Sequence, residues 1–145
     1  WGMSLGSMMA GIAFTNSGLG LVHAIALSLG GKYPLSHGET VAILLPAVMA
    51  FNASSNFEKF ADIAAMMGED TEGLSSGDAA MLAVDAVKRL AADIGIPASL
   101  KAVGVAEKDL ALIAEDTLKV QRLLVGNPRR VSSAAQVESV LRMIY

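Results

Sequence analysis

NSGLGLVHAIALSLGGKYPLSHGETVAILLPAVMAFN, residues 16–52, is the stretch from which the fold and any chemistry of this chain are best predicted. It contains both histidines of the sequence, His23 and His37. Glycines and prolines separate its apolar runs, and the spacing within those runs is typical of helices. The rest of the chain is rich in alanine and leucine, which indicates helices but points to no particular chemistry.

Two helices are predicted inside this stretch, over 19–29 and 37–51. The second begins after Ser36, because Ser36 and Glu39 have the spacing of a capping box, in which each side chain binds the backbone N–H of the other residue. This places His37 at the first helical position, near the positive end of the helix dipole. An internal proline is expected to kink this helix.

The remaining chain shows apolar residues at helical spacing and no alternation typical of strands. Asn16 or Ser17 is predicted to cap the helix over 19–29. Further helices or helical turns are expected over 4–14, 56–67, 77–94, 99–103, 106–118, 120–124 and 134–144. The sequence therefore predicts an all-α fold, a bundle of six to eight helices around one core, as a single domain over 1–145.

Charge and composition argue against several classes of function. The net charge is −3 and the pI is near 5.3, so no nucleic-acid partner is expected. The chain has no cysteine, which excludes disulfides, thiolate metal sites and a cysteine nucleophile. A cysteine-free chain fits a reducing compartment, and we expect a cytoplasmic protein.

The N-terminal part of the chain is unusually apolar. Residues 1–31 carry no Asp, Glu, Lys or Arg, and a run of about 20 apolar residues is enough to span a membrane. Polar and small residues at 15–18 interrupt the run, so we expect helices buried within a larger protein and no membrane anchor. Because the chain opens on Trp1, we expect it to be part of a longer protein. Helices 4–14 and 19–29 then expose apolar surface unless another chain covers them.

The residues around the two histidines are by themselves compatible with two interpretations. His23 on an apolar helix suits either a core histidine or a metal ligand. His37 follows on the next helix after a short turn, so the two rings can face each other. A metal needs three or four ligands, and the place of an i, i+4 partner for His23 is taken by Leu27. Glu39 is a candidate third ligand, although its capping role already explains it.

Several short motifs occur in the order and spacing found in one enzyme family. They are Asn16–His23, Leu29-Gly30-Gly31, His37-Gly38, Leu44-Leu45-Pro46, Met49–Asn52, Gly95-Ile96-Pro97 and Asn127-Pro128-Arg129. Through these motifs essentially the whole chain resembles the iron-containing (group III) alcohol dehydrogenase family. The resemblance is to the later part of the C-terminal helical domain, which has the dehydroquinate synthase-like fold.

The resemblance implies a metal site that this chain carries only in part. Members of the family have an N-terminal α/β domain that binds NAD(P) and a helical domain that holds Fe²⁺ or Zn²⁺ through one aspartate and three histidines. His23 and His37 match two of these ligands. The other two ligands lie on an earlier helix, which this chain does not contain, and the dinucleotide-binding domain is absent as well. No catalytic or cofactor-binding residue is assigned beyond the two histidines.

The function implied is hydride transfer between a small alcohol or aldehyde and NAD(P), with the metal bound to the alcohol oxygen. The isolated chain is expected to be inactive, and to associate with itself or with the missing part of the protein. Leu27 departs from the many members that carry a second histidine there, which puts a proton relay at that position in doubt. The alternative is a helical interaction or oligomerisation module without catalysis.

Overall fold

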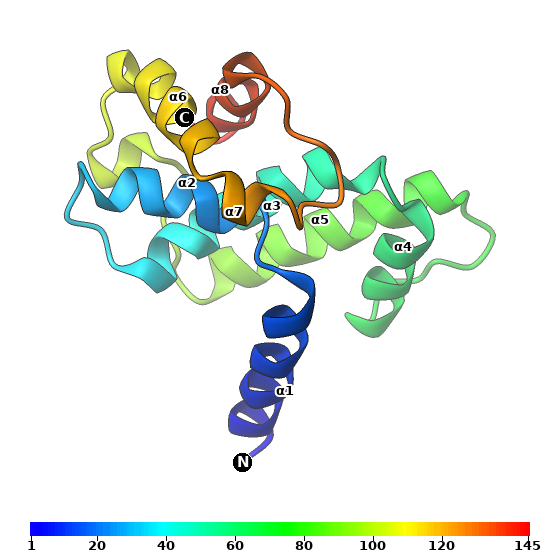
Figure 1. Cartoon of the computed structure of the whole chain (residues 1–145). Coiled ribbons are helices and arrows are strands. Elements are labelled where there is room, and N and C mark those ends of the chain that lie inside the picture. Colours follow the sequence, from blue (N-terminus) through cyan, green and yellow to red (C-terminus); the bar gives the residue numbers. More distant parts are fainter.

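The structure is a computed structural model that describes residues 1–145, and it contains helices and no strand (Figure 1). The elements are α1 (Gly2–Ser17), α2 (Leu21–Gly30), α3 (His37–Ala53), α4 (Phe57–Met66), α5 (Ser76–Asp93), η1 (Lys101–Val103), η2 (Glu107–Asp109), α6 (Leu110–Lys119), α7 (Gln121–Leu124) and α8 (Ala134–Arg142). The two η elements are short 3₁₀ helices. The predicted all-α fold and the number of helices are confirmed.

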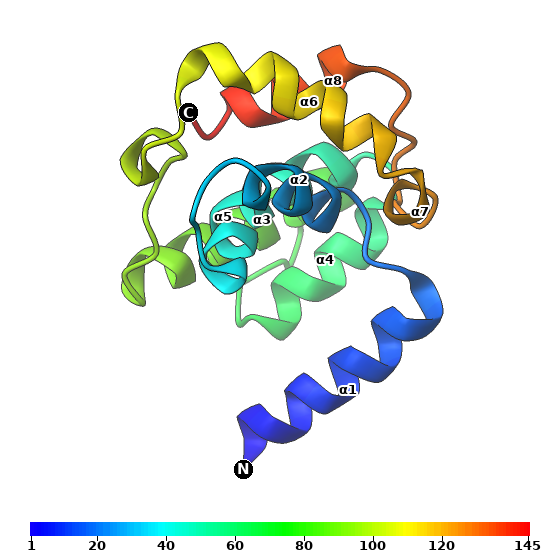
Figure 2. The same ribbon diagram turned by 60° about the vertical axis from the view of Figure 1, so that its left-hand side comes forward.

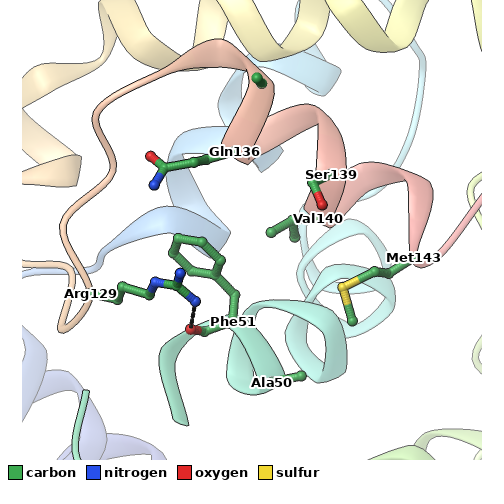
Figure 3. Close-up of a pocket in the computed structure, with 8 residues that line it drawn as sticks. Ala50, Phe51, Arg129, Gln136, Ser139, Val140 and Met143 are labelled. Atoms are coloured by element: carbon green, nitrogen blue, oxygen red, sulfur yellow. Dashed lines mark hydrogen bonds between the residues drawn. The ribbon is translucent and has the colours of Figure 1, made fainter. Parts of the chain in front are cut away.

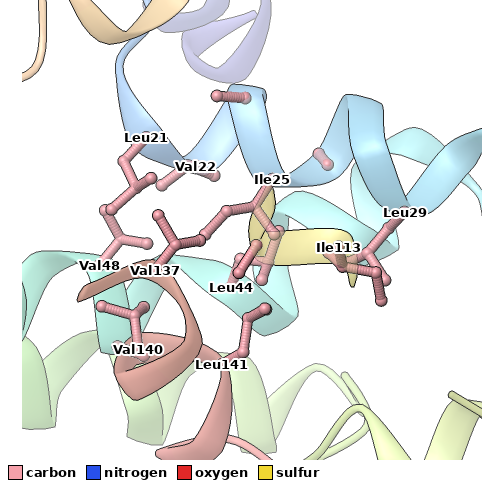
Figure 4. Packing of buried hydrophobic residues seen from close by; sticks show 14 of the residues in the cluster. Leu21, Val22, Ile25, Leu29, Leu44, Val48, Ile113, Val137, Val140 and Leu141 are labelled. Carbon is pink, nitrogen blue, oxygen red and sulfur yellow. The ribbon is translucent and has the colours of Figure 1, made fainter. Parts of the chain in front are cut away.

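The main core lies between α2, α3, α6 and α8 (Figure 4). Its cluster of 19 buried side chains includes Leu21, Ile25 and Leu29, which recur at every fourth position of α2 and are at most 1% exposed. Burying each such side chain stabilises the fold by about 1.5–3 kcal/mol. On the other side, α5 packs against α3, and α4 packs against α5. The helix that carries His23 is therefore central to the fold.

Helix α1 has no place in this core. It contains no buried residue, and it projects away from the body of the molecule in both views (Figures 1 and 2). Met9 and Ile12 are each 60% exposed, and Trp1 ahead of the helix is 99% exposed. The expected exposed apolar helix is therefore confirmed for 4–14. For 19–29 the expectation is wrong, because α2 finds its partners inside this chain.

The junction between α1 and α2 differs from the predicted one. The side chains of Thr15, Asn16 and Ser17 donate hydrogen bonds to the backbone carbonyls four residues earlier, which extends α1 to Ser17. Neither Asn16 nor Ser17 therefore caps α2, because both side chains are already used inside α1. No single helix is long and apolar enough to cross a membrane; α1 and α2 together reach that length and composition, but they meet at an angle of 98°.

Other helix starts follow their local sequence more closely. The side chain of Ser36 accepts a hydrogen bond from the Glu39 N–H, but the reciprocal bond of the predicted capping box is not formed. A complete capping box stands at α8, between Ser133 and Gln136. Helix α3 continues without a break through Pro46, which is buried.

Candidate metal centre

The structure brings the two predicted site residues together. His23 is the third residue of α2 and His37 is the first residue of α3. Their ring centroids are 5.4 Å apart, and the ring planes are tilted by 52°. The rest of α2 and a loop separate these residues in the sequence, so their contact comes from the way α3 folds back against α2.

One ring nitrogen at this site has no partner within the chain. Nδ1 of His23 is buried and forms no hydrogen bond, and it is the only buried side-chain nitrogen or oxygen in that state. Leaving such a group unsatisfied costs about 1–3 kcal/mol. Burial, and after it the nearby ring of His37, lowers the pKa of His23. The site therefore favours a neutral His23 imidazole, which is the form that binds a metal.

These observations fit a divalent cation better than a core histidine. A core histidine normally directs its ring nitrogens to hydrogen-bond partners. Here the ring of His23 has a free nitrogen and lies beside a second imidazole, and nitrogen donors of this kind suit Fe²⁺ and Zn²⁺. No group of three or more His, Cys, Asp or Glu side chains gathers in the chain, so Glu39 does not join the pair as a third ligand.

His37 is held by contacts around the start of α3. Ser36 Oγ accepts the Glu39 N–H across 3.3 Å, and Thr40 Oγ1 donates to the Ser36 carbonyl across 2.8 Å. Upstream, the Tyr33 hydroxyl donates to Asp109 Oδ2 across 2.6 Å and accepts the Ala106 N–H across 3.0 Å. The loop between the two histidines is thereby fixed to the start of α6.

The same contacts shift the pKa values of Tyr33 and Asp109. The hydrogen bond from Tyr33 lowers the pKa of Asp109, and Lys32, whose ammonium lies 3.5 Å from Asp109 Oδ1, acts in the same direction. The hydrogen bond to Asp109 raises the pKa of Tyr33. Around neutral pH the loop is therefore held by a neutral phenol donating to a carboxylate.

His23 is held in a different way. The residue before α2 is Gly20, which has no side chain to cap the helix. The Leu21 N–H instead donates to Oδ1 of Asn127, across 2.9 Å. Asn127 is buried, and it also exchanges hydrogen bonds with the buried amide of Asn52 at the end of α3. The turn of α2 that contains His23 thus depends on a residue from the loop between α7 and α8.

Comparison with known proteins places this chain in a family. The model of the Fe-containing alcohol dehydrogenase family, C-terminal part, matches residues 2–145. The chain belongs to the Fe-containing alcohol dehydrogenase family. It is 47% identical over 143 residues to a 1,3-propanediol dehydrogenase of Citrobacter freundii, an alignment that covers 99% of this chain and 36% of that enzyme.

Two further relatives agree with this assignment. A lactaldehyde reductase of Escherichia coli (strain K12) is 45% identical over 136 residues, covering 94% of this chain and 35% of that enzyme. The solved structure of an alcohol dehydrogenase from Oenococcus oeni matches with a TM-score of 0.90 at 42% identity, over 95% of this chain and 36% of that one. The chain therefore spans about a third of the length of these Fe-containing alcohol dehydrogenases.

Leu27, one turn after His23 in α2, lies beside His37. Leu27 is 58% exposed. With His37 and Leu35 it lines a hollow of about 430 Å³ at the surface of α2 and α3. An apolar side chain cannot accept or donate a proton, so any role of Leu27 in this hollow is to contact an apolar group or to exclude water.

A second hollow of about 480 Å³ lies toward the other end of α3, away from His37 (Figure 3). Phe51 and Arg129 stand at its wall: the Arg129 guanidinium lies 4.4 Å from the centre of the Phe51 ring and donates to the Phe51 carbonyl across 3.2 Å. These contacts stabilise the loop after α7, next to Asn127. The hollow contains neither histidine and is separate from the candidate metal centre.

Sequence reasoning missed the residues that hold the site together. Asn52 and Asn127 entered only as parts of motifs shared with the family, and Tyr33 was not singled out. A local signal for Asn127 does exist, because an Asn-Pro pair after a glycine is typical of a turn. No such signal shows that the amide of this turn caps a helix more than a hundred residues earlier.

Proposed function

We propose that this chain is the metal-binding part of an NAD(P)-dependent alcohol dehydrogenase, in which His23 and His37 bind one divalent cation, Fe²⁺ or Zn²⁺. The contact between the two rings, with a buried nitrogen of His23 left free, carries the proposal. The relatives support it: besides those above, an enzyme of Bacillus methanolicus that is 39% identical over 142 residues is named an NAD-dependent methanol dehydrogenase.

The residues of this chain supply part of what the reaction needs. Neutral imidazoles of His23 and His37 each offer one nitrogen to the cation, and α2 and α3 fix their relative position. When bound, the metal supplies a Lewis acid that stabilises negative charge on the oxygen of a small alcohol or aldehyde. Buried apolar residues flank His23 in α2 and restrict water on that side, which strengthens electrostatic interactions there, whereas His37 is exposed in this chain.

The rest of the reaction depends on parts outside these 145 residues. Two imidazoles leave a tetrahedral metal short of ligands. The chain also lacks strands, whereas a dinucleotide-binding domain is built on a parallel sheet. We therefore expect the isolated chain to bind metal weakly and to produce no NADH from NAD⁺ and 1,3-propanediol. Measurable formation of NADH by the purified chain, followed at 340 nm, contradicts this expectation.

Metal binding is tested by calorimetric titration of the chain with Zn²⁺. His23→Ala and His37→Ala should each weaken binding by at least about tenfold, because each removes one of two ligands. Glu39→Gln is the matched control, since Glu39 lies in the first turn of α3 but belongs to no ligand group, and it should bind like the wild type. If either histidine variant binds as tightly as the wild type, the ligand assignment is wrong.

A second candidate function is helical association without catalysis, and the exposure of α1 favours it. Helix α1 is apolar on all sides and contains no buried residue. We propose that a second copy of the chain, or the missing part of the protein, packs against it.

We expect the chain to self-associate in sedimentation. Met8 and Ile12 lie one turn apart, and changing both to lysine should give a monomer. Leu90→Lys, at a position of α5 that is 51% exposed, should leave association unchanged. A monomeric wild type contradicts this second proposal.

A further inference from the structure

Helix α2 begins without a capping residue of its own. The first N–H groups of a helix have no acceptor within it, and they are usually satisfied by the side chain of the preceding residue. Gly20 precedes α2 and forms no side-chain cap. The Leu21 N–H is instead accepted by Oδ1 of Asn127, 106 positions later in the sequence. His23 lies two residues after Leu21, within the turn that this bond holds.

The amide of Asn127 is fully used at this junction. Its oxygen accepts from the Leu21 N–H across 2.9 Å and from Asn52 Nδ2 across 3.2 Å. Its nitrogen donates to Asn52 Oδ1 across 2.8 Å and to the Arg129 carbonyl across 2.6 Å. A side-chain amide offers two donor hydrogens and two acceptor lone pairs, so no capacity is left over. Asn52 belongs to α3, so the same amide joins the two helices that carry His23 and His37.

The backbone around this amide is shaped to admit it. Gly20 has φ of 75°, and a Cβ at this position would lie 2.8 Å from Asn127 Oδ1. A Cβ on Gly126 would lie 2.7 Å from the Ser17 carbonyl. Two glycines from distant parts of the sequence therefore let the α1–α2 junction and the loop after α7 meet closely enough for the hydrogen bonds to form.

We propose that Asn127 is a positioning residue for the metal centre. By capping α2 and binding Asn52, it fixes the first turn of α2 against α3 and so sets the place of His23 relative to His37. The inference rests on the proposed metal binding by the two histidines. Asn127 itself does not touch the metal, and its effect on the metal passes through the backbone of Leu21 to His23.

The test compares variants of the 145-residue chain. Asn127→Ala removes all four hydrogen bonds of the side chain, the cap on Leu21 among them, whereas Asn127→Asp keeps an acceptor oxygen for the Leu21 N–H. Val84→Ala is the control for lost stability, because Val84 is fully buried on α5 and lies outside the core cluster around α2. Three quantities are measured for each: Zn²⁺ affinity by calorimetry, the nuclear Overhauser effect between the two histidine rings, and hydrogen exchange of the α2 amides.

We expect Asn127→Ala to lower Zn²⁺ affinity by at least about tenfold, as loss of a residue that orients a ligand does. The nuclear Overhauser effect between the two histidine rings should weaken. Hydrogen exchange of the Leu21 amide should become more than tenfold faster, while the later amides of α3 remain protected. Asn127→Asp should restore protection at Leu21, and Val84→Ala should keep the wild-type affinity and ring contact.

Two outcomes separate this inference from the proposed function. The inference is overturned if Asn127→Ala changes neither the hydrogen exchange of the Leu21 amide nor the contact between the histidine rings. It is also overturned if the wild type binds Zn²⁺ and Asn127→Ala binds it equally tightly. If the wild type binds no Zn²⁺, the proposed function is overturned, and the exchange and ring-contact measurements still decide whether Asn127 positions His23.

Discussion

The two helices that carry the histidines begin in contrasting ways. At the start of α3, the capping side chain is Ser36, immediately before His37 in the sequence. At the start of α2, the cap is Asn127, 106 residues away from Leu21. The position of His37 is thus specified by its neighbours, and the position of His23 by a contact that exists only once the C-terminal part of the chain has folded. The positions of the two histidines therefore depend on two different kinds of contact, one local and one remote in sequence.

The first prediction concerns the cap that Asn127 provides for α2, and it has the largest expected effect on the free energy of unfolding. Gly20→Ala should lower the free energy of unfolding by about 2–6 kcal/mol. The backbone of Gly20, at φ 75° and ψ −162°, lies in a region that is nearly exclusive to glycine and costs other residues about 1–3 kcal/mol. Displacing Asn127 Oδ1 also leaves the Leu21 N–H unsatisfied, at about 1–3 kcal/mol. Urea unfolding followed by circular dichroism measures the change.

The matched control is the same substitution at the start of α3. Gly38 lies in the first turn of that helix, and a Cβ there meets nothing within 4 Å. Gly38→Ala should therefore stabilise the chain by about 0.5–1 kcal/mol, because alanine loses less backbone entropy in a helix. Equal changes in the free energy of unfolding for Gly20→Ala and Gly38→Ala would contradict the difference between the starts of α2 and α3.

The second prediction removes the local cap. Ser36→Ala should lower the free energy of unfolding by about 1 kcal/mol, the usual value for loss of a capping serine. The effect should stay within the first turn of α3, where hydrogen exchange at Glu39 should rise while that at Leu21 remains slow. Faster exchange at both helix starts would argue that their caps are coupled, and not independent.

The third prediction concerns the loop between the histidines and has the smallest expected effect. Tyr33→Phe removes the hydrogen bonds to Asp109 and from Ala106, so it should destabilise the chain slightly at neutral pH. Tyr33 lowers the pKa of Asp109, so the stability from this bond is present above the ordinary aspartate pKa of about 3.9 and is lost as the pH falls through the lowered value. The stability difference between wild type and Tyr33→Phe should therefore shrink below pH 4. A difference that stays constant from pH 7 down to pH 2 would contradict this assignment.

Much of the fold could be predicted from the sequence because its signals are local. The spacing of apolar residues placed α5 close to its observed range, and Ser36 marked the start of α3. The start of α2 was predicted wrongly for a physical reason. Asn16 and Ser17 are typical capping residues, but their side chains bind carbonyls inside α1. Only the tertiary structure shows that Asn127 takes over the role.

The contrast between α1 and α2 shows a second limit of sequence reasoning. Both helices are apolar and uncharged, so composition alone predicted the same exposure for both. In the structure α2 is central to the core, whereas no residue of α1 is buried or belongs to it. Whether an apolar helix is buried depends on the elements that pack against it, and α3, α6 and α7 pack against α2. The contact between His23 and His37 is likewise a consequence of that packing.

The central claim is that these two histidines share one metal ion, and X-ray absorption of the Zn²⁺-loaded chain tests it most directly. We expect two imidazole nitrogens at about 2.0–2.1 Å from the zinc, the remaining ligands being oxygens of solvent. His23→Ala and His37→Ala should each leave a single imidazole in the spectrum. A zinc environment with no imidazole, or one that neither substitution changes, would contradict the claim.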